Sequence, residues 1–330
     1  MNCPHCNGRH LRKAGFGVRQ SQKVQRYWCV DCNRRFSDHA NTPMFSVRKP
    51  IEQVERVLAM RSEGMGIRAV SRVEHISPQT VINWEKRLAA KVDAWSPPVP
   101  EEADITAEGD EVYTRVNKNH PAHKSQGWTL NIMERQSRDW WVGLVGLRDN
   151  ALFEAGMQRF WNWAQSALFI RLFTDGERRY SQSLWPVASI FLKKEETSRD
   201  YHHRKVWRYV LEVACKIKGS QGNPRRAWCY REHPLTAISD ESEVHANHQE
   251  AFNASLRRRC SGYRRRQNLY AKQREGLQRS VDVQRLIHNW VRVHISLPDK
   301  STPAMSMGYI ERPVTLREIL TCRGFEALSS

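Results

Sequence analysis

Two pairs of cysteines near the N-terminus limit what this part of the chain can fold into. Cys3 and Cys6 form one Cys-x-x-Cys hook, and Cys29 and Cys32 form a second hook after residues 7–28. Two such hooks can supply four thiolates to one tetrahedral zinc ion, because the two-residue gap lets both sulfurs of a hook reach the metal. A strand-like segment, Val24–Trp28, leads into the second hook. We therefore predict a zinc ribbon over residues 1–45 that binds a structural Zn²⁺.

The charge balance indicates a polyanionic partner. The chain has 53 Lys and Arg against 35 Asp and Glu, a net charge of +18, and a pI near 9.9. Nucleic acid is the first candidate and an anionic membrane the second. No apolar run approaches the roughly 18 residues that a membrane span needs, and the N-terminus has no apolar signal segment. We expect a cytoplasmic protein that does not enter a membrane. In the ribbon, the predicted DNA contacts are Arg26, Arg34 and Arg35.

Residues 46–93 change to a helical period. Ile51, Val54 and Leu58 fall on one face, and a short second helix follows Gly66. A third helix begins at Ser77-Pro78, where Ser77 is a suitable N-cap. This succession is typical of a helix-turn-helix, whose second helix of the pair reads the major groove; the alternative is a three-helix bundle with a solvated face. The predicted DNA contacts are Gln79, Thr80, Asn83, Lys86 and Arg87, whereas Trp84 is expected in the core.

A Pro-rich, acidic stretch at residues 94–104 is predicted to be a linker. Strand-like segments then follow at 105–116, 127–132 and 140–145, a helical segment at 152–167, and an apolar strand at 168–173. This pattern predicts an α/β catalytic domain with a mixed sheet over residues 105–300. We expect an insertion around 195–240, containing an added helix from Tyr201 to Ser220, and a C-terminal tail at 301–330. The apolar helix around Trp290 is either core or dimer surface, and core is favoured.

Carboxylates in this region have the arrangement expected of a metal site. Asp175 follows a buried strand directly, and Asp110 lies in the first strand beside Glu111. Neighbouring side chains on a strand face opposite ways, so only one of that pair can share a site with Asp175. Taken alone, each aspartate has an ordinary interpretation, as an exposed strand residue or a turn residue. Together on neighbouring strands they favour a shared metal site.

A third carboxylate is needed to hold two magnesium ions with open positions for a phosphodiester. Glu250 is the favoured candidate, because Asn253 lies on the same helix face at i+3 and a basic run follows. Glu241 and Glu243 are competitors. The basic run predicts a groove for the DNA backbone, with a solvated helix face as the alternative; its candidate residues are Arg257, Arg258, Arg264, Arg265 and Arg266.

Five histidines, together with Cys215 and Cys229, are candidate ligands for a second zinc site. Their spacing matches no ligand pattern, so we predict ordinary histidines and buried thiols. The histidines are His202, His203, His233, His245 and His248.

These motifs resemble those of transposases of bacterial insertion sequences, most closely the family founded by insertion sequence one. The resemblance rests on the cysteine hooks with Arg26-Tyr27, on Asp110-Glu111, on Thr174-Asp175-Gly176, on Glu250-x-x-Asn253 followed by Leu256-Arg257, and on Thr302–Gly308. It implies an RNase H-like fold with strand order 3-2-1-4-5. Asp110, Asp175 and Glu250 would bind two Mg²⁺ or Mn²⁺ ions, with Asn253 as a further catalytic residue.

The same resemblance implies DNA strand cleavage and strand transfer on double-stranded DNA, the element ends and the target. It also implies a homodimer or higher assembly, and a nucleoid-associated protein of the bacterial cytoplasm. Val112-Tyr113-Thr114 departs from the family's aromatic-Ser-aromatic pattern. The alternatives are a transcription regulator with a zinc ribbon, a helix-turn-helix and a non-catalytic domain, and a nuclease that cuts without joining.

Overall fold

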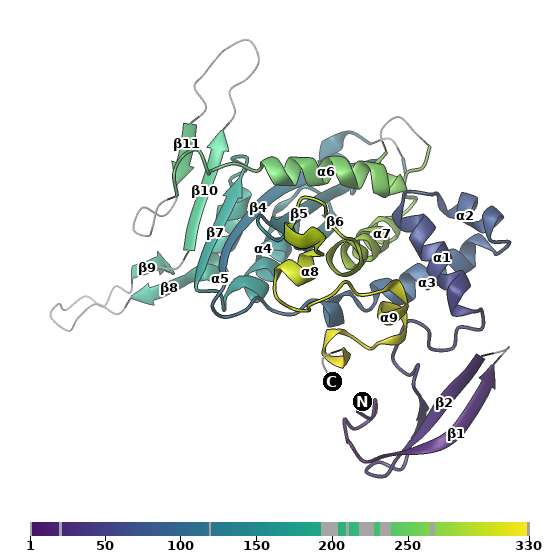
Figure 1. Ribbon diagram of the computed structural model, residues 1–330. Coiled ribbons are helices and arrows are strands. Elements are labelled where there is room, and N and C mark those ends of the chain that lie inside the picture. Colours follow the sequence, from purple (N-terminus) through teal and green to yellow (C-terminus); the bar gives the residue numbers. More distant parts are fainter. Residues whose placement is uncertain are drawn as a thin grey trace.

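The computed structural model describes residues 2–19, 22–118, 120–192, 204–208, 211–217, 228–231, 239–264 and 268–328. Within them, the chain forms a small N-terminal sheet, a group of helices, and a large sheet with helices on both faces (Figure 1). This is a mixed α/β architecture, as the sequence predicts.

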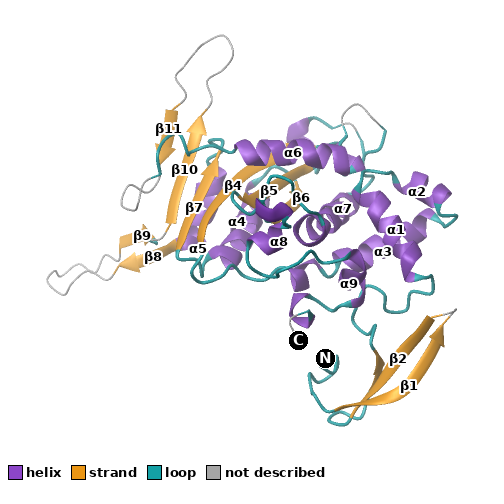
Figure 2. Ribbon diagram, in the orientation of Figure 1, coloured by secondary structure: helices purple, strands orange, loops and turns teal. Residues whose placement is uncertain are grey.

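The N-terminal sheet is antiparallel, in the order β1-β2-β3. Its strands are β1 (Leu11–Arg19), β2 (Gln22–Cys29) and β3 (Arg35–Ser37). Its small core consists of Cys3, Cys29, Phe36 and Ala40. In Figure 2 this sheet lies apart from the rest of the molecule and is connected to it by the segment that leads to the first helix.

The three helices predicted for residues 46–93 are present as α1 (Ile51–Ser62), α2 (Ile67–Val73) and α3 (Pro78–Ala89). The Ser77 side chain accepts the Thr80 N–H and Pro78 occupies the first position of α3, so the predicted cap is confirmed. Trp84 is buried, as expected.

The large sheet has the order β11-β10-β7-β4-β5-β6. Its strands are β4 (Asp104–Tyr113), β5 (Trp128–Glu134), β6 (Trp140–Gly146), β7 (Phe169–Thr174), β10 (Leu211–Ile217) and β11 (Trp228–Arg231). β4, β5 and β6 are antiparallel neighbours, whereas β7 pairs parallel with both β4 and β10. β4 and β7 therefore run in the same direction, and β7 ends beside the middle of β4, where Phe173 pairs with Glu108.

Alternation along the strands gives the large sheet two apolar faces. On one face, Ala107 and Leu130 pack with Phe153 and Met157 of α4 (Asn150–Ala164) and with Leu184 of α5 (Arg179–Ala188). The opposite face packs against α6 (Asn247–Arg259) and α7 (Arg274–Leu286), as Figure 1 shows. On that face Val112, Met133 and Trp140 contact Phe252, Leu256, Leu277 and Val281.

The added helix predicted from Tyr201 to Ser220 is wrong for the residues that are described there. They form β9 (Arg204–Trp207), which pairs with β8 (Ser189–Leu192), and β10. β10 pairs in register with β7 from Leu211 to Cys215, so a strand of the central sheet lies inside the predicted insertion. The physical reason is that Leu211, Val213 and Ala214 are buried when the segment is extended.

Residues 94–104 and 301–328 contribute buried side chains to the core and do not only connect other elements. Trp95, Trp290, Ala304, Ile319 and other buried residues share one cluster with α1, α3 and α7. Their elements include a 3-10 helix (Val92–Trp95), a π-helical turn (Ile287–Val291), α8 (Pro303–Ser306) and α9 (Leu316–Thr321). Trp290 is thus a core residue, the interpretation that the sequence favoured over a dimer surface. The segment near the C-terminus also contacts the ribbon, since Arg323 donates to the backbone oxygen of Ala40 at 3.0 Å.

Candidate active site and metal sites

Asp110 lies in the middle strand of the large sheet, on the face that α6 covers. Its Oδ1 accepts the Glu111 N–H at 2.8 Å, and its Oδ2 accepts the Asn253 side-chain amide at 2.7 Å. Burial and the nearby charges of Asp175, Glu111 and Glu250 raise the pKa of Asp110 to about 7. The carboxylates predicted from the sequence therefore lie close enough to repel one another.

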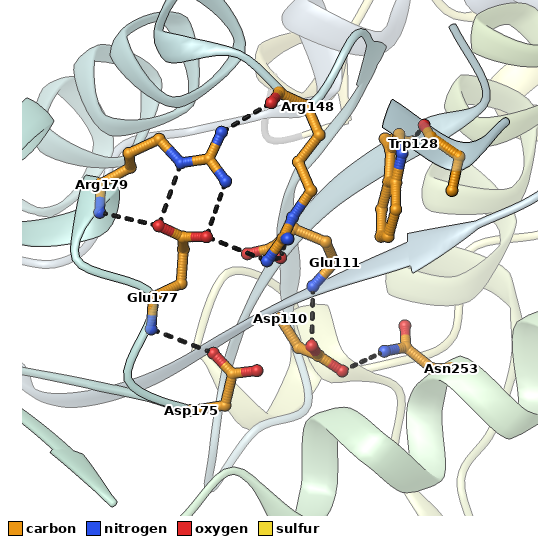
Figure 3. Close-up of polar contacts among 9 residues, drawn as sticks. Asp110, Glu111, Trp128, Arg148, Asp175, Glu177, Arg179 and Asn253 are labelled. Carbon is orange, nitrogen blue, oxygen red and sulfur yellow. Dashed lines mark hydrogen bonds and ion pairs between the residues drawn. The ribbon is translucent and has the colours of Figure 1, made fainter. Parts of the chain in front are cut away.

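Asp175 follows β7 directly, and the register of β7 with β4, in which Phe173 pairs with Glu108, brings Asp175 near Asp110. The turn after it depends on Gly176, whose φ of +96° is favourable only for glycine. Asp175 Oδ1 accepts the Glu177 N–H at 3.4 Å, and the side chain is exposed. Figure 3 shows the Asp175 and Asp110 carboxylates on the same side of the sheet edge.

Glu250 and Asn253 come from α6, which crosses above β4. Glu250 lies in the first turn of the helix and is exposed, so its carboxylate is open to solvent. Asn253 is only 3% exposed, and its side-chain oxygen accepts the Asn131 amide at 3.2 Å. Because Asn131 orients it in this way, Asn253 donates to Asp110. Because Asn253 is buried, it can hold the Asp110 carboxylate in place but is not placed to contact DNA.

Glu111 faces the opposite side of β4, as alternation requires, and belongs to a network that the sequence did not indicate. Arg148 donates to Glu111 Oε2 at 2.8 Å and lies 2.9 Å from Glu177 Oε2. Arg179 bonds the same Glu177 oxygen at 2.6 Å (Figure 3). Burial raises the pKa of Glu111, while Arg148 opposes that rise. Glu177 and Arg179 are near neighbours in the chain, but no spacing in the sequence indicates that they contact Glu111 and Arg148. The fold brings these distant residues together.

The cysteine hooks come together as predicted. Cys3 Sγ lies 3.6 Å from Cys32 Sγ, and Cys6 Sγ lies 3.6 Å from Cys29 Sγ. All four sulfurs lie within 4.8 Å of one another, a spacing that one tetrahedral zinc ion can bridge. The His5 N–H also points at Cys3 Sγ, at 3.5 Å. This cluster of four cysteines could therefore be a zinc site.

A second compact group consists of Glu108, His245 and His248. Two of the five histidines thus meet a glutamate of β4, and Cys215 is not part of this group. The other three histidines lie outside the described residues, as does the Cys229 side chain. Asp110, Asp175 and Glu250 do not form such a compact group among the described residues.

The residues predicted to contact DNA are mostly at the surface. Gln79, Asn83 and Lys86 are exposed on α3, and Thr80 and Arg87 are half-buried there. Arg87 also bonds the backbone oxygen of Phe45. In the ribbon Arg26, Arg34 and Arg35 are exposed; after the first turns of α6, Arg258 is exposed and Arg257 and Arg264 are half-buried. Arg265 and Arg266 lie outside the described residues.

No family model matches this chain, and a search of curated proteins returned no match. None of the helices in the described ranges is both long enough and apolar enough to cross a membrane.

Proposed function

We propose that this chain is a DNA transposase with an Asp-Asp-Glu catalytic site, which cuts the ends of a mobile element and joins them to target DNA. One observation carries the proposal: Asp110 of β4 is buried near the charges of Asp175, which follows β7, and Glu250 of α6, and burial together with these charges and that of Glu111 raises the pKa of Asp110 to about 7. The order β6-β5-β4-β7-β10 corresponds to the order 3-2-1-4-5 that the resemblance implies, which supports an RNase H-like fold.

The donor set fits magnesium or manganese. Carboxylate oxygens are the ligands these ions prefer, and the mutual repulsion at Asp110 is relieved when cations bind. Asp110, Asp175 and Glu250 would hold the ions. Two ions held there would activate a water, or later a DNA 3′-hydroxyl, for attack at phosphorus and neutralise the departing 3′ oxygen.

The protein's own side chains organise this site. Asn253, held by Asn131, fixes one Asp110 oxygen and leaves the carboxylate aimed at the sheet edge. On the opposite face of β4, Arg148 is held between Glu111 and Glu177 and is one-third exposed.

Double-stranded DNA is the proposed partner, bound by a helix-turn-helix in α2 and α3, by the ribbon and by the arginines of α6. The exposed polar face of α3 suits a major groove. A Cβ atom at Gly64, in the α1–α2 turn, would lie 2.6 Å from the Arg258 backbone oxygen, so this turn touches the end of α6. Basic residues of α6 therefore continue the same surface. Because two element ends must meet, we also propose a homodimer or higher assembly.

The test is cleavage and joining of labelled duplexes that carry the terminal sequences flanking the gene, with Mg²⁺. Asp175→Asn should bind the duplex as wild type does and lose both cleavage and joining. Glu243→Gln, which changes an exposed carboxylate ahead of α6, is the matched control and should remain active.

Each other outcome favours a different function. Binding of the duplex without any cleavage by the wild type would support a transcription regulator. Cleavage without joining would support a nuclease.

A further inference from the structure

Glu108 is a fully buried carboxylate two residues before Asp110 on the same face of β4. Its side chain is 0% exposed. A buried charge is costly unless it is paired and hydrogen-bonded. The hydrogen-bond partners of Glu108 therefore indicate its role in the structure.

The Glu108 carboxylate caps α6 from outside the helix. The N-cap residue of α6 is Ala246, which offers no side-chain cap to the free N–H groups of the first turn. Glu108 Oε2 accepts the Gln249 N–H at 2.9 Å and so satisfies one of them. His248 Nδ1 of the same turn lies 2.9 Å from Glu108 Oε1. A negative charge at this end of a helix also interacts favourably with the helix dipole.

Arg135 completes the anchor from the turn after β5. Its Nε donates to Glu108 Oε1 at 2.6 Å, and its Nη2 donates to the His245 backbone oxygen at 2.7 Å. Arg135 thus bonds both Glu108 of β4 and His245, which lies two residues before α6.

The ligand atoms of Glu108, His245 and His248 are close enough for a metal ion, but Arg135 already supplies the cation. Its Nη2 lies 3.3 Å from His245 Nδ1, and its Nε bonds the same Glu108 oxygen as His248. A metal ion at this position would contact the guanidinium. The cluster is better explained as a structural anchor.

α6 is then tied to β4 at two points on either side of Glu250. Glu108 holds the first turn, and Asp110 accepts the Asn253 amide about one turn further on. We propose that Glu108 is a positioning residue: together with Arg135 it fixes the first turn of α6 so that Glu250 stands beside Asp110. This inference rests on the proposed function, because it assigns Glu250 a place in the metal site.

The test compares full-length Glu108→Gln with wild type across a magnesium titration of duplex cleavage. Glutamine keeps the size of the side chain but loses the charge and one acceptor. The Mg²⁺ concentration for half-maximal cleavage should rise about tenfold or more, the range typical when a group supporting metal ligands is removed. A role in stability alone would lower the amount of active protein and leave this concentration unchanged.

Glu134→Gln is the matched control. Glu134 is also a buried carboxylate of this sheet, but it accepts the backbone N–H and hydroxyl of Ser137, each at 2.6 Å, and the Thr106 N–H of β4 at 3.4 Å, and none of these partners belongs to α6. It should leave the magnesium requirement as in wild type. If Glu108→Gln does not fold, Arg135→Lys, which keeps the charge but not the paired bonds, should raise the requirement in the same direction.

Hydrogen exchange separates this inference from the proposed function. The amides in the first turn of α6 should exchange faster in Glu108→Gln than in wild type, and Glu134→Gln should not change them. Wild-type cleavage with an unaltered magnesium requirement in Glu108→Gln would overturn the inference. If the wild type does not cleave at all, the proposed function fails, and unchanged exchange in α6 would then overturn the anchor as well.

Discussion

Glu85 of α3 is buried between two arginines, and replacing it with glutamine should destabilise the protein strongly. Arg61 of α1 donates to Glu85 Oε1 at 2.6 Å, and Arg279 of α7 donates to Oε2 at 3.1 Å. The exposed fractions of the Glu85, Arg61 and Arg279 side chains are 1%, 6% and 13%. One carboxylate therefore compensates two buried cations and joins α3 to a helix that covers the large sheet.

Glu85→Gln keeps the shape but leaves both guanidinium groups without a counter-charge. Removing one partner of a buried ion pair typically costs about 3–5 kcal/mol, because the remaining charge stays desolvated. The amide nitrogen would also face one of the two donors. We therefore expect the free energy of unfolding to fall by about 3–5 kcal/mol.

A second ion pair, between Glu63 and Arg292, provides the control. Glu63 and Arg292 also meet at 2.6 Å, but the Glu63 side chain is 63% exposed. Glu63→Gln should cost less than about 1 kcal/mol, since exposed ion pairs are worth little. Urea unfolding, followed by tryptophan fluorescence from Trp84 and Trp290 in this core, measures both changes. Equal losses in the two variants would refute the argument that burial determines the cost.

Two further predictions concern the metal sites. The pKa of Asp110 is raised from 3.8 to about 7 on folding, so its stabilising contribution is complete below the lower value and is lost as pH rises through the higher one. In magnesium-free buffer Asp110→Asn should therefore gain stability relative to wild type between pH 5 and pH 8, by about 3 kcal/mol, because about two pKa units of the shift lie above pH 5 and each is worth ~1.36 kcal/mol; thermal melts at the two pH values measure this, and a difference independent of pH would contradict it. Cys32→Ser should abolish zinc binding at the proposed four-cysteine site and unfold the ribbon, because such sites supply the folding energy of small modules. The core around Trp84 should persist, because it contains no residue of the four-cysteine cluster; zinc retained by the variant, measured by metal release, would exclude these ligands.

Local chemistry made several elements predictable from the sequence. The spacing of Cys3, Cys6, Cys29 and Cys32 is sufficient to propose a tetrahedral cluster, because each hook closes within one turn. Ser77-Pro78 fixes the start of α3 through one hydrogen bond and one restricted dihedral. Asp110 and Asp175 could be paired in advance because they were expected on neighbouring strands of one sheet, and β4 and β7 are such neighbours.

The helix predicted from residue 201 to residue 220 is wrong because the local sequence does not by itself decide between a helix and short strands. Leu211–Ile217 becomes a strand because β7 offers a parallel neighbour and an apolar face, which is information from outside the segment.

What the sequence determined by itself is therefore the chemistry that acts over a few residues: the cysteine hooks, the helix caps, the alternation that separates Asp110 from Glu111, and the strong positive charge. What only the tertiary structure decided is which distant groups share a buried site, such as Glu108 with the first turn of α6, or Glu85 with Arg61 and Arg279. The physical reason is that a buried charge must find its partners wherever the fold places them, and sequence separation does not limit that choice.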